Sequence, residues 1–116
     1  MSESATHSYT PTADEIAELQ ASAVQASRLM KLLASEQRLA LLCSLLENEC
    51  SVGELARNSG LSQTTVSQHL AKLRAERIVA TRRDAQTIFY RLDDQAATQV
   101  LHTLCGIYRP GAARPG

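Results

Sequence analysis

The clearest chemical signal in the sequence is a group of polar side chains between residues 62 and 72. On an α-helix, Gln63, Thr64, Ser67 and Gln68 would share one exposed face, and Lys72 would extend it. A glutamine amide can bond an adenine edge bidentately, and serine and threonine hydroxyls can reach bases or phosphates. The amino end of such a helix also directs backbone N–H groups and a positive dipole toward a phosphate. The pattern therefore predicts a helix that reads base edges in a DNA groove.

Basic side chains follow this predicted reading face. Lys72, Arg74 and Arg77 are expected to neutralise flanking phosphates. Arg82 and Arg83 are placed to reach the neighbouring backbone or the minor groove. The residues predicted to contact DNA are Ser62, Gln63, Thr64, Thr65, Ser67, Gln68, His69, Lys72, Arg74, Arg77, Arg82, Arg83 and Gln86.

The distribution of charge along the chain favours the same segment. The 116 residues include 12 basic and 12 acidic side chains, so the formal net charge is zero. Residues 1–56 nevertheless carry eight acids against three bases, whereas residues 57–91 carry seven bases against two acids. A neutral protein with one basic segment can still present a positive surface to phosphates. A solvated helix face with scattered lysine and arginine would give the same counts.

The element that must position these side chains is a pair of short helices joined by a tight turn. Ser51 and Glu54 form an S-x-x-E capping pattern that predicts the start of the first helix. Gly60 permits the left-handed backbone of the turn, and Ser62 is a suitable N-cap for the second helix, which ends at about Arg77. The apolar residues predicted to face the core are Val52, Leu55, Ala56, Val66, Leu70 and Leu73. This pattern is typical of a helix-turn-helix, and the alternative is a plain bundle of amphipathic helices.

Two more helices are predicted before this pair. A T-x-x-E pattern at Thr12 and Glu15 begins a helix of about 20 residues, because apolar residues recur at helical spacing as far as Leu33. Ser35 is the expected N-cap of a second helix that ends at about Glu47.

A hairpin and a last helix are predicted after the pair. β-rich runs at residues 78–83 and 86–92 flank a turn at Asp84 and Ala85, and Asp93 or Asp94 caps the last helix. The fold class is therefore mainly α with a small β-hairpin, a winged helix-turn-helix in the order α-α-α-α-β-β-α. The expected domain spans residues 13–109, between a disordered lead-in at 1–12 and a flexible tail at 110–116.

Composition excludes several other classes. No run of 18 apolar residues is present, so no membrane span is expected, and the first residues do not resemble a secretory signal. We therefore expect a cytoplasmic protein whose three cysteines are reduced at rest. No two of them have the C-x-x-C spacing, so neither a zinc ribbon nor a disulfide framework is indicated, and no cofactor is expected.

The motifs resemble those of the ArsR/SmtB family, and within it the NolR, HlyU, BigR and SqrR type. The resemblance covers about residues 15–110, and its most specific parts are Ser67-Gln-His-Leu70 and Arg82-Arg-Asp-Ala-Gln-Thr-Ile88. It implies a dimer built on the first and last helices. It also implies repression at an inverted-repeat DNA operator, released by an inducer in many members. A dimer agrees with the physics of recognition, because one helix reads only a few base pairs.

The metal sites known in this family have no counterpart here. The three thiols of the arsenic-type motif would fall on Ser51, Gly53 and Ala56, and His102 stands alone where the zinc-type pattern would be. No metal ligand is therefore assigned.

A thiol sensor remains open. Members of the BigR and SqrR type resemble each other in having one cysteine in the second helix and one near the end of the last helix, and Cys43 matches the first. The second position would fall near Arg109, so Cys105, about one turn earlier, is the candidate partner. The inducer would then be an oxidant or reactive sulfur. Cys105 as a buried apolar filler, a regulator without thiol input, and a three-thiol As(III) site completed by Cys50 are the alternatives.

Two other function classes were weighed against a DNA-binding regulator. An enzyme with a Cys–His pair would need a base, an oxyanion donor and a pocket, and no glycine-rich loop or carboxylate cluster supplies one. A protein–protein adaptor could use the same winged fold. The sequence therefore predicts a regulator rather than an enzyme.

Overall fold

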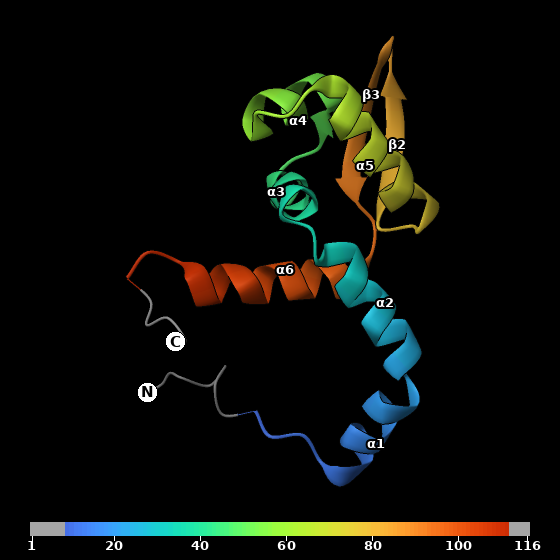
Figure 1. Ribbon diagram of the computed structural model, residues 1–116, viewed down its shortest axis with the longest axis vertical. Coiled ribbons are helices and arrows are strands. Elements are labelled where there is room, and N and C mark those ends of the chain that lie inside the picture. The colour runs from blue at the N-terminus through green and yellow to red at the C-terminus, as the bar shows by residue number, and fades with distance from the viewer. Residues whose placement is uncertain (1–8, 112–116) are drawn as a thin grey trace. The chain divides into compact units, whose positions relative to one another are not determined.

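The computed structural model describes residues 9–111 and divides the chain into two compact units, one ending at Lys31 and one beginning at Leu32 (Figure 1). The first unit holds α1 (Ala13–Ala21) and most of α2 (Ala23–Leu33). The predicted lead-in at 1–12 and tail at 110–116 lie largely outside the described residues. The second unit holds α3 (Glu36–Ser44), β1 (Cys50–Ser51), α4 (Val52–Ser59), α5 (Gln63–Ala75), β2 (Val79–Asp84), β3 (Thr87–Leu92) and α6 (Gln95–Tyr108).

The start of α1 is the predicted capping box. The backbone N–H of Thr12 donates to Glu15 Oε1 at 2.8 Å, and the Glu15 N–H donates to Thr12 Oγ1 at 3.1 Å. These two bonds satisfy backbone donors that have no partner within the helix.

The prediction of one first helix of about 20 residues is wrong, because the chain leaves helical geometry at Ser22. Ser22 has φ −101° and ψ 15°, and its N–H is shared between the carbonyls of Glu18 and Leu19 at 3.0 Å each. Sharing a donor between the i−3 and i−4 carbonyls is how a helix end tightens. Serine is also a weaker helix former than alanine or leucine. The segment therefore forms two helices instead of one.

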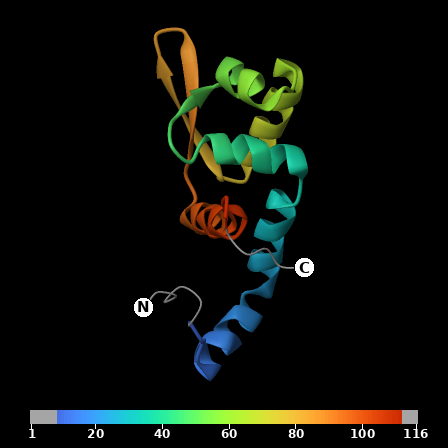
Figure 2. The same ribbon diagram turned by 90° about the vertical axis from the view of Figure 1, so that its left-hand side faces the viewer.

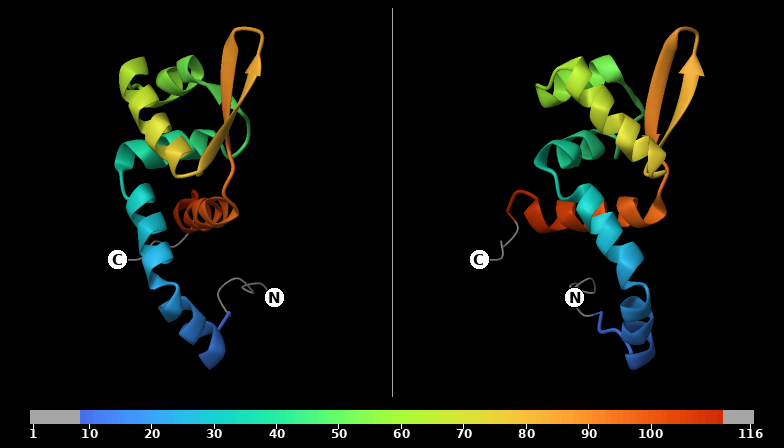
Figure 3. Two further views of the ribbon diagram at one scale, coloured as in Figure 1. Left: turned by 90° about the vertical axis from the view of Figure 1, so that its right-hand side faces the viewer. Right: turned by 45° about the vertical axis from the view of Figure 1, so that its right-hand side comes forward.

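The predicted hairpin is confirmed and forms a wing beside α5. β2 and β3 pair antiparallel from Val79 opposite Leu92 to Asp84 opposite Thr87, and the hairpin projects past α4 and α5 (Figures 2 and 3). The connection is one residue later than predicted: Ala85 and Gln86 join the strands, and Ala85 takes the positive φ of 58° that a two-residue turn needs.

A third strand was not predicted. β1 pairs antiparallel with β3, so the sheet order is β1-β3-β2. Only two residues take part, Cys50 opposite Tyr90 and Ser51 opposite Phe89. A strand this short leaves no period-2 pattern in the sequence, and only its pairing defines it.

The core of the second unit is aliphatic and contains four of the six residues predicted for it, whereas Val52 and Ala56 are only half-buried. Leu55, Val66, Leu70 and Leu73 are all fully buried, so α4 and α5 pack through the predicted faces. α3 ends at Ser44, three residues before its predicted end, and contributes Leu41 and Leu42. The buried apolar residues are Leu32, Leu33, Leu41, Leu42, Leu45, Cys50, Leu55, Val66, Leu70, Leu73, Ile78, Val79, Ala97 and Leu101.

The turn between α4 and α5 is the predicted one. Gly60 has φ 76°, and its N–H donates to the Ala56 carbonyl at 2.9 Å. Such left-handed backbone favours glycine, which has no Cβ to clash. α5 then begins at Gln63 with Ser62 as its N-cap.

The end of α5 makes a stability prediction, because a residue with a Cβ occupies the left-handed position there. Arg77 has φ 61°, its N–H donates to the Arg74 carbonyl at 3.0 Å, and the Ile78 N–H reaches the Leu73 carbonyl at 2.9 Å. Replacing Arg77 by glycine should raise the free energy of unfolding by about 1 kcal/mol, because glycine adopts this backbone without steric cost. Urea unfolding of both proteins measures the change.

The matched control for that prediction is Arg77→Ala, which removes the same charge but keeps a Cβ. This variant should show no comparable gain. Equal stability of the glycine and alanine variants would mean that the left-handed backbone at Arg77 carries no strain.

Candidate nucleic-acid interface

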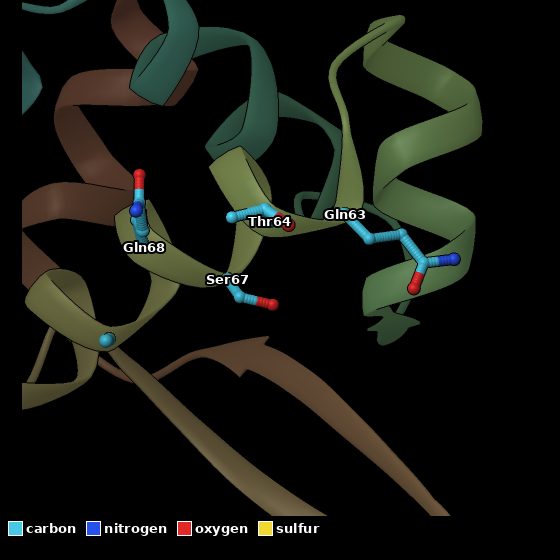
Figure 4. Close-up of a pocket in the computed structure, with 5 residues that line it drawn as sticks. Gln63, Thr64, Ser67 and Gln68 are labelled. Carbon is cyan, nitrogen blue, oxygen red and sulfur yellow. The ribbon is translucent and has the colours of Figure 1, made fainter.

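The exposed face of α5 carries an uncharged polar surface, which we call the reading face. Gln63, Thr64, Ser67, Gln68 and Ala71 line a shallow open depression there (Figure 4). The predicted grouping of the four polar residues is thus present. Figure 4 shows the Gln63 side chain extended toward α4, where its Nε2 atom lies 3.9 Å from the position a Cβ on Gly53 would take. The two amides and two hydroxyls offer donors and acceptors without any fixed charge.

The sequence holds this face outward by burying the opposite side of the same helix. Val66, Leu70 and Leu73 are fully buried under α5. At the amino end, Ser62 Oγ accepts from the Thr65 N–H at 3.1 Å and donates to Thr65 Oγ1 at 3.0 Å. Both hydroxyls therefore serve the start of the helix. No acidic residue stands in the first turn, so the positive end of the helix dipole is not neutralised by its own side chains.

His69, also predicted to touch DNA, is turned toward α3. Its Nδ1 atom accepts from Arg38 Nε at 3.4 Å, and its Nε2 atom lies 2.9 Å from Gln37 Oε1. Arg38 also donates through Nη1 to the Leu32 carbonyl at the end of α2, at 3.2 Å. Both ring nitrogens of His69 are thus engaged within the chain. The sequence analysis missed Gln37 and Arg38, which carry no motif and lie more than 30 residues from their partner.

The basic residues predicted to contact DNA are exposed to solvent, but one of them, Arg82, is paired with an acidic side chain. Lys72, Arg74 and Arg77 are exposed at the carboxyl end of α5, and Arg83 is exposed on the wing. Gln86 is exposed in the turn of the hairpin. Exposed basic side chains therefore lie at the carboxyl end of the reading helix and on the wing.

Arg82 is tied to the protein itself. Its Nε atom donates to Glu49 Oε1 at 2.6 Å, and its guanidinium carbon lies 4.9 Å from the centroid of the Phe89 ring. Phe89 is the residue opposite Arg82 in the hairpin, so both side chains lie on the same face of the sheet. The Glu49 carboxylate offsets the Arg82 charge, whereas Arg83 points to the other face of β2.

The three cysteines have different surroundings. Cys43 on α3 and Cys105 on α6 are exposed, and Cys50 is buried. Partial shielding from water and then the nearby Cys105 raise the pKa of Cys43, so the two thiols are close enough to interact electrostatically. Burial and the Glu54 carboxylate raise the pKa of Cys50. Its single S–H group is shared between the carbonyls of Ser44 and Asn48, each 3.6 Å from the sulfur.

The described part of the chain brings no metal site together. Within residues 9–111, no three side chains of histidine, cysteine, aspartate or glutamate cluster as a metal ion would require. The three-thiol arrangement considered for As(III) therefore has no support in the geometry. No helix in the same range is long and apolar enough to cross a bilayer.

Comparisons with known proteins agree with this arrangement. Residues 35–81 match the family described as bacterial regulatory protein, arsR family. The transcriptional activator HlyU of Vibrio cholerae is 47% identical over 90 residues, which is 75% of this chain and 83% of HlyU. The structure of the transcriptional repressor BigR from Xylella fastidiosa is similar with a TM-score of 0.75 and 41% identity, covering 79% of this chain and 94% of BigR.

A second similar structure is that of a homodimeric winged helix-turn-helix DNA-binding domain, Mb0332 from Mycobacterium bovis. Its TM-score is 0.65 at 26% identity, and the match covers 85% of this chain and 89% of that domain.

Proposed function

The chain belongs to the arsR family of bacterial regulatory proteins and is a DNA-binding transcription regulator, and we propose that it acts in the cytoplasm as a homodimeric repressor on an inverted-repeat operator. The observation that carries the proposal is the reading face of α5, an uncharged polar surface, together with exposed basic side chains at the carboxyl end of this helix and on the wing. Helices with such faces enter the major groove, where base edges are exposed.

The residues of the reading face favour A·T pairs. Two amides can bond adenine edges, and the methyl groups of Thr64 and Ala71 can contact thymine methyls. The five residues include neither a lysine or arginine for guanine nor a carboxylate for the amino group of cytosine. We therefore expect half-sites rich in A·T pairs at the positions under α5.

Apolar surface on the first and last helices supports a dimer. Ile16, Leu19, Val24 and Met30 are exposed on α1 and α2, with Val24 at 79%. On α6, Val100 and Leu104 line a shallow depression with Ala96, Gln99 and Thr103. A second copy of the chain would remove this apolar surface from water and bring a second reading helix to the operator.

The test of this function is selection of duplexes from a randomised pool by the full-length protein. We expect an inverted repeat whose half-sites are about one helical turn apart, bound by a dimer in sedimentation experiments. Affinity for the selected duplex should exceed that for random duplex by about 1000-fold or more, and should fall steeply with salt. Equal affinity for selected and random duplexes would contradict the proposal.

Regulation through Cys43 and Cys105 is the second part of the proposal. Both thiols are exposed and each is within electrostatic range of the other. Hydrogen peroxide would take two electrons and two protons from the pair, giving one disulfide and two waters. With an inorganic polysulfide, sulfane sulfur would be the two-electron oxidant: one sulfur atom would be inserted between the two thiols, and a second would leave as hydrogen sulfide with the two thiol protons. Either link would tie α3 to α6 and change the spacing of the two reading helices.

An enzyme with a cysteine nucleophile is not proposed. Within the described residues, no histidine is hydrogen-bonded to a cysteine, and the ring nitrogens of His69 are held by Gln37 and Arg38. A catalytic cysteine would need such a base beside it to take up its proton.

A further inference from the structure

The side-chain hydrogen bonds between α3 and α5 meet at one side chain, His69, which directly follows the reading-face residue Gln68 on α5. Arg38 is the central donor of this group, because it reaches both the His69 ring on α5 and the Leu32 carbonyl at the end of α2. Gln37, on the same helix as Arg38, meets the other ring nitrogen. We propose that Arg38 and His69 are a positioning pair that holds α5 in its DNA-reading orientation, and that the pair works only while His69 is neutral. This inference rests on the proposed function.

The geometry assigns the protonation state in which the pair forms. The Arg38 guanidinium has only N–H donors, so His69 Nδ1 must be an acceptor and carry no proton. The single ring proton is then on Nε2, where it donates to the Gln37 oxygen at 2.9 Å. A second proton on Nδ1 would place two N–H groups against each other and break the bond to Arg38.

The groups that face His69 offer no acceptor to a proton on Nδ1. From α3 they are the cation of Arg38 and the neutral amide of Gln37. Along α5, the nearest ionisable side chain is the exposed Lys72, three residues further on. Among residues 9–111 no carboxylate is hydrogen-bonded to the ring, and the hydrogen bonds of the ring nitrogens are the two already given. Protonation of His69 would therefore break the hydrogen bond from Arg38 without forming a new one.

The direction in which specific DNA affinity changes as the pH falls distinguishes a positioning role of His69 from simple electrostatic attraction to phosphates. A histidine that merely adds charge near phosphates would strengthen DNA binding as the pH falls. A histidine that positions α5 when neutral would weaken specific binding over the same range, because the reading face loses its orientation. Binding to random duplex, which depends on phosphate contacts alone, should not weaken.

The test measures affinity by fluorescence anisotropy for two duplexes, one selected by the wild-type protein and one of random sequence. Between about pH 7.5 and pH 5.5, specific affinity of the wild type should fall about three- to tenfold, the effect of losing one hydrogen bond. His69→Asn keeps an acceptor for Arg38 in place of Nδ1 but does not titrate. Its specific affinity should stay within about twofold of the wild type at the higher pH and should not fall at the lower pH.

Two further variants complete the test. His102→Asn removes an exposed histidine on α6 and should leave the wild-type pH profile unchanged. Arg38→Met keeps most of the side-chain length but no donors, so it should lower specific affinity at about pH 7.5 by about three- to tenfold and give a flat profile. Circular dichroism at each pH verifies that all variants are folded.

Two results would overturn the positioning pair. One is a His69→Asn profile identical to that of the wild type, and the other is an Arg38→Met protein with full specific affinity. Nitrogen NMR of the free protein gives an answer that does not depend on DNA, since neutral His69 must carry its proton on Nε2. A proton on Nδ1 would refute the pair, even if the protein reads DNA as proposed, and the Nε2 tautomer would support it even if no preferred duplex is found.

Discussion

Replacing both Gln63 and Gln68 by alanine should remove most of the preference for operator over random DNA. Each glutamine can form a bidentate pair with an adenine edge, and such a pair discriminates by about 1–3 kcal/mol, or about tenfold to more than a hundredfold. The two side chains lie on the reading face, away from the buried residues of α5, so the fold should not change. Selection experiments with the double variant, read by sequencing, measure the loss of base preference directly.

Arg83→Ala is the matched control for that experiment. Arg83 is exposed on the wing, so its loss should weaken binding to every duplex alike and lower the salt slope by about one. The comparison of the double glutamine variant with Arg83→Ala distinguishes sequence reading by α5 from attraction of phosphates by the basic side chains outside the reading face. If the double glutamine variant selects the same operator as the wild type, the bases are read by other residues.

Joining Cys43 to Cys105 should lower operator affinity by about 5- to 150-fold, the usual range of coupling between two sites. The link would connect α3 with α6, and through them the reading helix with the surface proposed for dimer contact. Mass spectrometry after treatment with peroxide or an inorganic polysulfide identifies the linked cysteines, and anisotropy on the same samples gives the affinity. The response should disappear in Cys43→Ser and in Cys105→Ser.

Cys50→Ser is the matched control, because Cys50 is buried and its thiol is already bonded to two carbonyls. This variant should respond as the wild type does. The raised pKa of Cys43 adds a pH test: only the thiolate reacts, so labelling of Cys43 should quicken about tenfold per pH unit up to that pKa. A linked protein with unchanged affinity would leave a regulator without thiol input, which was one of the alternatives.

The helix-turn-helix could be predicted from the sequence because its signals are local. The capping pair Ser51 and Glu54, the left-handed Gly60 and the N-cap Ser62 each act within about four residues of their own position. The periodicity of Leu55 and Leu70 then defines which side of each helix is buried, and so which side is left for DNA. Fold class and reading face follow from such short-range rules.

The sequence could not show what depends on the packing of distant segments. The bond from Arg38 to His69 and the ion pair of Arg82 with Glu49 join residues 31 and 33 positions apart. Neither pair has a spacing rule, because the geometry arises only when whole helices and strands pack together. The short strand β1 exists for the same reason, since β3 supplies its only partner.

The sequence by itself determined which faces of the helices are buried and which are exposed. The reason is that the hydrophobicity of each side chain and the spacing of the apolar residues are both properties of the sequence. Only the tertiary structure decided which polar side chains are left free for DNA and which are held within the protein. His69 and Arg82 both have suitable chemistry for a nucleic acid, yet each is bonded to a side chain more than 30 positions away. The physical reason is competition: a hydrogen-bonding group near the surface pairs with whatever partner the fold brings within reach.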